Sequence, residues 1–106
     1  MLNILKNLFS KTDNSQLAVL VNDGASLVDV RTPVEFASGH VKGSVNIPLD
    51  RIPGQLNNLK GKKHIIVFCR SGNRSSQAKS FLEQKGFTNV TNGGTWQDVN
   101  KLVTNK

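Results

Sequence analysis

The residues with the clearest chemical potential lie in one short segment around the only cysteine of the chain, Cys69. The segment reads CRSGNRS over residues 69–75 and is called the Cys69 loop below. An unperturbed cysteine has a pKa of about 8.5 and is only a few per cent thiolate at neutral pH. Unpaired N–H groups at a helix N-terminus and nearby arginines stabilise the anion. The pattern therefore predicts an activated, nucleophilic thiolate.

The remaining residues of the Cys69 loop suit the binding of an anion beside that thiolate. Glycine at position 72 allows a tight curve in which successive N–H groups point inward. Serine hydroxyls add donors, and two arginines add positive charge. The predicted binding residues are Arg70, Ser71, Gly72, Asn73, Arg74 and Ser75. The alternative is that Cys69 is a small buried apolar residue, as many free cysteines are.

Composition limits what else the chain can be. Its 106 residues suit one domain, and 14 Lys+Arg against seven Asp+Glu give a net charge of +7. A single cysteine excludes an internal disulfide, a CxxC pair and a cysteine-rich zinc site, and we expect no metal and no cofactor. The basic residues are scattered without interleaved aromatic residues, so a small anion is a better expected partner than a nucleic acid.

No apolar run approaches the roughly 18 residues that span a bilayer. The first residues are interrupted by Asn3, Lys6 and Asn7 and lack a small-residue cleavage site, so they make a poor signal peptide. We therefore expect a cytoplasmic protein with no integral membrane segment. Oligomeric state is left open, although the apolar helical face predicted over residues 2–9 is the best candidate for a contact surface.

The elements that must position the Cys69 loop alternate between short strands and helices. Strands are predicted over residues 26–30, 45–47, 65–68 and 88–90, and a turn at residues 93–94. One helix is predicted to begin after a cap at Asp13 or Ser15, and a short one to begin at Thr32–Pro33. A helix with a weak pattern is predicted to end at Leu59. Two more are predicted over residues 75–85 and 95–103. This order predicts an α/β fold with a mostly parallel central sheet of about five short strands and helices on both faces. Ligands bind such sheets at the carboxyl ends of the strands, where Cys69 lies.

Several segments together resemble the single-domain rhodanese-like (thiosulfate sulfurtransferase) family over about residues 15–100. LVDVR at residues 27–31 is similar to the first signature strand, and Glu35–Phe36 to the helix after it. GHVKGSVNIP at residues 39–48 resembles the family segment GHIxGAxNIP, and FCRSGNRS resembles the active-site loop CxxGxR. GlyPhe at 86–87 and GlyGly at 93–94 before Trp96 match the C-terminal pattern. We expect an N-terminal amphipathic extension over residues 1–14 and a rhodanese-like domain over residues 15–106.

The resemblance implies a covalent mechanism. Cys69 would take the outer sulfur of thiosulfate or another persulfide donor, release sulfite and hand the sulfur to cyanide, a thiol or a protein acceptor. Backbone N–H groups of the Cys69 loop would cradle the persulfide, and Arg74, then Arg70, would bind the substrate anion. Related dual-specificity phosphatases have five residues between cysteine and arginine. Here four separate Cys69 from Arg74, which favours a sulfur atom over a phosphate.

Four residues outside the Cys69 loop have both a functional and a structural interpretation. In the functional interpretation, Asp29 orients groups of the Cys69 loop and Arg31 adds to the positive electrostatic field at the same edge of the sheet. We favour structural roles, with Asp29 capping the helix at Pro33 and Arg31 pairing with Glu35. His40 could be a general base, but a hydrogen-bonded turn residue is favoured. Trp96 is favoured as a core residue.

Two other functions stay open from the residues alone. One is a non-catalytic rhodanese-like module that binds an acidic protein through its basic rim. The other is a phosphatase or arsenate reductase. An intact Cys69 loop argues against the first, and the loop length argues against the second.

Overall fold

A four-stranded parallel sheet forms the centre of the molecule in our computed structural model, which describes residues 13–104. The strand order is β2 (Val45–Asn46), β1 (Ser26–Asp29), β3 (Ile65–Cys69) and β4 (Val90–Thr95). All three neighbouring pairs are parallel. The predicted α/β class is confirmed, with four strands in the described residues where about five were expected. The predicted helical face over residues 2–9 lies outside the described residues.

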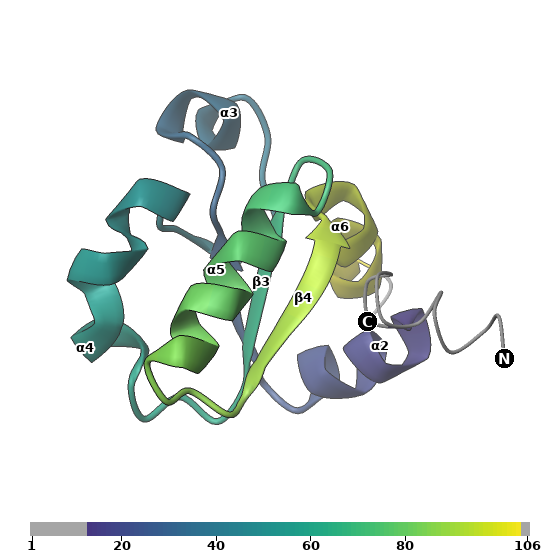
Figure 1. The fold of residues 1–106 in the computed structure, drawn as a ribbon. Helices are drawn as coiled ribbons and strands as arrows, with labels where there is room; N and C mark the ends of the chain where they lie inside the picture. The colour runs from purple at the N-terminus through teal and green to yellow at the C-terminus, as the bar shows by residue number, and fades with distance from the viewer. Residues whose placement is uncertain (1–12, 105–106) are drawn as a thin grey trace, which may run out of the picture.

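Helices cover both faces of the sheet. α2 (Asn14–Asn22) and α6 (Trp96–Thr104) pack on one face, and α5 (Asn73–Gln84) packs on the other beside the 3-10 helix η1 (Leu49–Gln55) and α4 (Leu56–Leu59) (Figure 1). The short α3 (Pro33–Ala37) follows β1. None of the helices between residues 13 and 104 combines the length and the apolar character that spanning a bilayer requires.

The predicted helix starts at Asp13 and Thr32 are confirmed by their caps. The Asp13 carboxylate accepts the N–H of Ser15 at 2.7 Å. Thr32 forms a capping box with Glu35, in which each side chain accepts a backbone N–H of the other residue. Pro33 follows at the first helical position, where its missing N–H is not needed. The capping box matters for the site because it fixes the Glu35 carboxylate.

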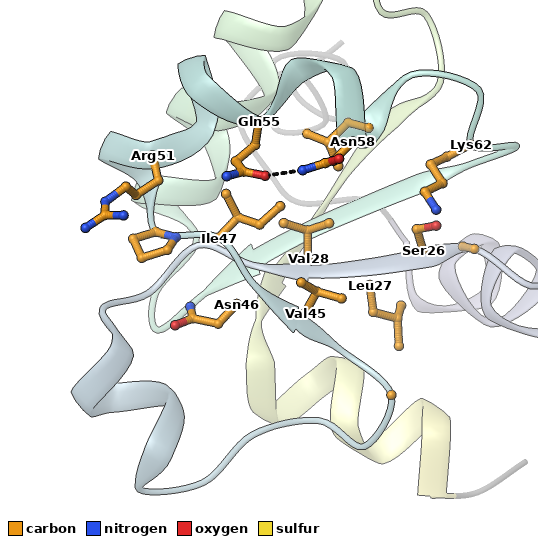
Figure 2. Close-up of a pocket in the computed structure, with 14 residues that line it drawn as sticks. Ser26, Leu27, Val28, Val45, Asn46, Ile47, Arg51, Gln55, Asn58 and Lys62 are labelled. Atoms are coloured by element: carbon orange, nitrogen blue, oxygen red, sulfur yellow. Dashed lines mark hydrogen bonds between the residues drawn. The ribbon is translucent and has the colours of Figure 1, made fainter.

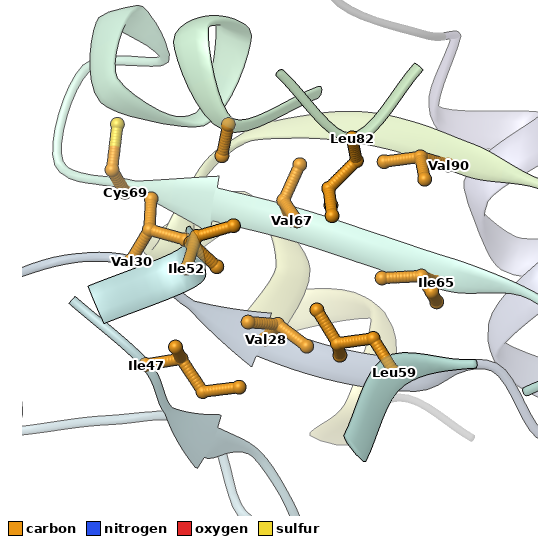
Figure 3. Close-up of a cluster of buried hydrophobic side chains, with 11 residues drawn as sticks. Val28, Val30, Ile47, Ile52, Leu59, Ile65, Val67, Cys69, Leu82 and Val90 are labelled. Carbon is orange, nitrogen blue, oxygen red and sulfur yellow. The ribbon is translucent and has the colours of Figure 1, made fainter. Parts of the chain in front are cut away.

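The central strand β3 supplies side chains to both cores, because successive residues of a strand point to opposite faces. Ile65, Val67 and Cys69 face the layer of α5 and η1, where Leu82 and Ile52 cover them (Figure 3). Residues 66 and 68 face α2 and α6 in a second core. All five residues of β3 are buried, so the strand is a rigid base for the Cys69 loop.

The last strand corrects two sequence predictions. β4 begins at Val90, later than expected, and runs through Gly93 and Gly94, where a turn was predicted. Its register shifts opposite Val67 and the residue after it, so that Gly93 is the extra residue of a bulge. A Cβ atom on Gly93 would lie 2.9 Å from a methyl group of Ile66 and another of Val99. Glycine is therefore required here by close packing of α6 on the sheet.

Candidate active site

Cys69 ends β3 and lies at the carboxyl edge of the sheet, directly before the turn that leads into α5. Its side chain is fully buried, and its thiol is free. Gly72 adopts the left-handed conformation, with φ +96°, and its N–H donates to Cys69 Sγ at 3.0 Å. A residue with a Cβ atom is strained at this φ, which explains why the loop has glycine here. The sequence prediction of a curved, N–H-lined loop is confirmed for this contact.

A buried serine completes the surroundings of the sulfur atom. Ser75 is fully buried, and its Oγ lies 3.5 Å from Cys69 Sγ. Burial raises the pKa of the Cys69 thiol, but hydrogen bonds from the Ser75 hydroxyl and from the N–H groups of Ser75, Ser71 and Gly72 outweigh it. The pKa of Cys69 therefore lies below its ordinary value. The backbone N–H groups that the sequence interpretation invoked are among these donors, whereas the two arginines that it also invoked are not.

The two arginines of the Cys69 loop have different surroundings. Arg74 forms a bidentate ion pair with Glu35, with N–O distances of 2.7 and 3.0 Å. The N–H of Thr32 also donates to the Glu35 carboxylate, at 3.0 Å. Arg70 is exposed to solvent, as are Ser71 and residue 73. The pair thus joins the start of α5 to α3, a contact between residues far apart in the chain.

The Glu35–Arg74 pair makes stability depend on pH. The Arg74 guanidinium, followed by the Thr32 N–H, lowers the pKa of Glu35 from 4.5 to about 2. A carboxyl whose folded pKa is depressed stabilises the fold above its unfolded pKa and loses that contribution as pH falls. We expect Glu35→Gln to cost about 1–2 kcal/mol at pH 7, less than the full shift implies because the pair is partly exposed. Urea unfolding should show this cost shrinking below pH 4.5 and vanishing near pH 2.

A matched control tests whether the effect belongs to this ion pair. Glu83 pairs with Lys79 on the exposed side of α5 at 3.5 Å. Glu83→Gln should cost less than about 0.5 kcal/mol and show little pH dependence. An equal cost for both variants, or a Glu35→Gln cost that persists at pH 2, would contradict the assignment.

Asp29 and Arg31 form a buried pair beside the Cys69 loop rather than part of it. Arg31 donates to both carboxylate oxygens of Asp29, with its Nη2 2.7 Å from Oδ2, and Nη2 also donates to the Gly39 carbonyl oxygen at 2.7 Å. Its guanidinium carbon lies 4.7 Å from the centre of the Trp96 ring. The favoured structural role fits these contacts. Two predicted contacts were wrong. Arg31 pairs with Asp29 and not with Glu35, which pairs with Arg74, and Asp29 does not cap α3, whose cap is the predicted Thr32.

His40 has the surroundings of the predicted turn residue. Its Nδ1 lies 2.8 Å from the Phe36 carbonyl oxygen, and the two rings stack with centroids 3.9 Å apart. Trp96 is partly buried and packs against the core formed with α2 and α6. Asn92 was not predicted as a site residue, yet its side chain contacts Ser75 and Gly72. No local pattern points to it, because the pairing of β4 with β3 brings it there.

A sizeable hollow of the described residues lies away from Cys69. It has a volume of about 710 Å³ and lies between the β1–β2 edge of the sheet and the segment η1–α4 (Figure 2). Its lining contains no cysteine, histidine or carboxylate, and no residue of the Cys69 loop. Residues 13–104 also hold no group of three or more His, Cys, Asp or Glu that could bind a metal ion. Within residues 13–104, the Cys69 loop is therefore kept as the candidate active site.

In this parallel α/β fold a buried thiol ends the strand β3, and backbone N–H groups at the start of the next helix can stabilise its thiolate. The sequence profile of the rhodanese-like domain matches residues 13–95. The chain belongs to the rhodanese-like domain family, and relatives in this family are named thiosulfate sulfurtransferases.

Three relatives show the extent of the similarity. A sulfurtransferase of Allochromatium vinosum is 38% identical over 66 residues, which cover 62% of this chain and 62% of that protein. The thiosulfate sulfurtransferase PspE of Escherichia coli is 35% identical over 74 residues, covering 68% of this chain and 71% of that protein. A solved structure from Staphylococcus saprophyticus is 31% identical with a TM-score of 0.71, covering 87% of this chain and 93% of the other.

Proposed function

We propose that this chain is a thiosulfate sulfurtransferase that carries sulfane sulfur as a persulfide on Cys69. The observation that carries the proposal is the donation of the Gly72 N–H to Cys69 Sγ at 3.0 Å, in a loop whose further donors lower the pKa of Cys69. A thiolate is the nucleophilic form of cysteine. The names of the relatives support the same reaction class.

The proposed reaction has two steps and needs no redox partner. The Cys69 thiolate attacks the outer sulfur of thiosulfate, a new S–S bond forms, the old S–S bond breaks, and sulfite leaves with the electron pair. A nucleophilic acceptor, such as cyanide or a thiolate, then attacks the terminal sulfur of the persulfide. The S–S bond to Cys69 breaks, and the thiolate is regenerated. This is covalent catalysis with ping-pong kinetics.

The Cys69 loop supplies the electrostatic part of the reaction. The persulfide places its negative charge one atom beyond Sγ, where the N–H groups of residues 70–75 can cradle it. Exposed Arg70 attracts the thiosulfate dianion in this proposal. Arg74, the arginine favoured from the sequence, has its charge balanced by the Glu35 carboxylate and so contributes less. The four-residue separation of Cys69 and Arg74 makes a smaller cradle than a phosphate requires.

The acceptor in this proposal is a separate molecule. The chain has one cysteine, so no second thiol of its own can remove the sulfur from Cys69. A small thiol or a thiol-bearing protein is the proposed acceptor. The reaction requires that Cys69 stay reduced, which is the condition of the cytoplasm that we propose as its location.

The proposal is tested by the mass of the intact protein after incubation with thiosulfate and removal of excess reagent. We expect a gain of one sulfur atom, which cyanide then removes with formation of thiocyanate. The control is Cys69→Ser, which should gain nothing. An unmodified wild-type protein, or the same gain in Cys69→Ser, would overturn the proposal. Faster turnover of an aryl phosphate or arsenate than of thiosulfate would do the same.

A further inference from the structure

The side chain of Asn92, on β4, occupies a defined place behind the Cys69 loop. Its Oδ1 accepts the Gly94 N–H at 2.9 Å, and its Nδ2 faces the Gly72 carbonyl oxygen at 3.4 Å. These two contacts fix which end of the amide is oxygen, because an N–H needs an acceptor and a carbonyl needs a donor. The carbonyl oxygen of Asn92 therefore faces Ser75, whose Oγ lies 2.7 Å away.

Ser75 has one hydroxyl proton and three possible acceptors for it. They are Asn92 Oδ1 at 2.7 Å, the Gly72 carbonyl oxygen at 3.1 Å and Cys69 Sγ at 3.5 Å. The hydroxyl is fully buried, so bulk solvent does not compete for its proton. A hydroxyl donates one hydrogen bond at a time. The shortest contact, to Asn92, thus competes directly with donation to the sulfur atom.

We propose that Asn92 is a positioning residue that holds the Ser75 hydroxyl proton and so sets how strongly Ser75 stabilises the Cys69 thiolate. The inference deepens the proposed function, because the thiolate is the nucleophile of that reaction. In the thiol form, Cys69 S–H donates to Ser75 Oγ, and Ser75 donates to Asn92. In the thiolate form the sulfur can only accept, so the Ser75 proton rotates to Sγ and Asn92 keeps only the Gly94 N–H.

The same rotation distinguishes the sulfur-loaded form from the resting thiolate. In the persulfide, the negative charge moves from Sγ to the terminal sulfur atom. A neutral bridging sulfur is a weak acceptor, and the Ser75 proton returns to Asn92. Asn92 therefore favours the thiol and the persulfide over the thiolate, and its removal favours the thiolate.

The test is a double-mutant cycle on Asn92 and Ser75, read out by titration of the Cys69 thiolate. The chain has one cysteine and no tyrosine, so its ultraviolet thiolate absorbance reports Cys69 without tyrosinate. Ser75→Ala should raise the pKa of Cys69 because it removes a donor. Asn92→Ala should lower it by about 0.5–1 unit, since the Ser75 proton is released toward sulfur. In the Ser75→Ala background, Asn92→Ala should have no effect.

Two further variants keep the test decisive. Asn89→Ala removes a similar amide–backbone contact, 2.6 Å to the Lys62 carbonyl oxygen, at the far end of the sheet and should leave the pKa of Cys69 unchanged. If Asn92→Ala does not fold, Asn92→Asp keeps both acceptor contacts of Oδ1. The carboxylate of this variant accepts the Ser75 hydroxyl proton more strongly than the amide does, so the pKa of Cys69 should rise. At least half of that rise should disappear in the Ser75→Ala background.

Several outcomes would overturn the inference. One is a pKa of Cys69 that rises in Asn92→Ala. Another is an Asn92→Ala change in the pKa of Cys69 that has the same size in the wild-type and Ser75→Ala backgrounds. A third is a rise in the pKa of Cys69 in Asn92→Asp that mostly persists in the Ser75→Ala background. These readings are made on the resting protein without thiosulfate. They are therefore distinguishable from failure of the proposed function, which would appear as absence of the persulfide.

Discussion

Replacement of Cys69 by serine is expected to reduce thiosulfate:cyanide sulfur transfer by at least a thousand-fold while the protein stays folded. The proposed reaction requires a sulfur nucleophile, and loss of a covalent nucleophile removes turnover almost entirely. A serine hydroxyl has no anionic form near neutral pH at this site. It can still accept the Gly72 N–H that now donates to Cys69 Sγ at 3.0 Å, so the loop keeps its shape.

The measurement is steady-state formation of thiocyanate, with thermal unfolding followed in parallel. We expect the free energy of unfolding of Cys69→Ser to lie within about 1 kcal/mol of wild type, since the substitution is nearly isosteric. Wild-type protein alkylated at its single cysteine is the matched chemical control and should be equally inactive. More than about 1% of wild-type turnover in Cys69→Ser would contradict covalent catalysis at this residue.

Replacement of Arg31 by methionine is expected to give the largest loss of stability, about 3–5 kcal/mol. The variant leaves the fully buried carboxylate of Asp29 without its partner, and an unpaired charge in the interior is far more costly than a lost surface pair. It also removes the donor to the Gly39 carbonyl oxygen and the contact with the Trp96 ring. The segment that follows α3 should loosen as a result.

Urea unfolding of the two arginine variants checks this prediction. Arg51→Met makes the same chemical change at an exposed position of η1 and should cost less than about 0.5 kcal/mol. The double variant Asp29→Leu/Arg31→Met should regain part of the stability lost in Arg31→Met, because neither charge then remains buried alone. A cost for Arg31→Met as small as that for Arg51→Met would refute the structural role of the pair.

Much of the local structure followed from the sequence because it depends on neighbouring residues. The caps at Asp13 and Thr32 formed as expected, since a short polar side chain bonds N–H groups two or three residues away. The apolar run of residues 65–68 became the central strand, because strands buried on both faces lack alternation. β4 was harder to predict. The Gly93–Gly94 pair is typical of turns, but close packing of Ile66 and Val99 requires Gly93 within the strand.

The sequence by itself determined the fold class, the family resemblance and the place of Cys69 at the end of a strand before a helix. Tertiary structure decided which distant side chains meet there. It paired Glu35 with Arg74, turned Arg31 toward Asp29, and brought Asn92 to Ser75. These contacts join residues on different elements, and local propensities do not encode them. They arise because parallel pairing and helix packing bring the carboxyl ends of the strands to one edge of the sheet.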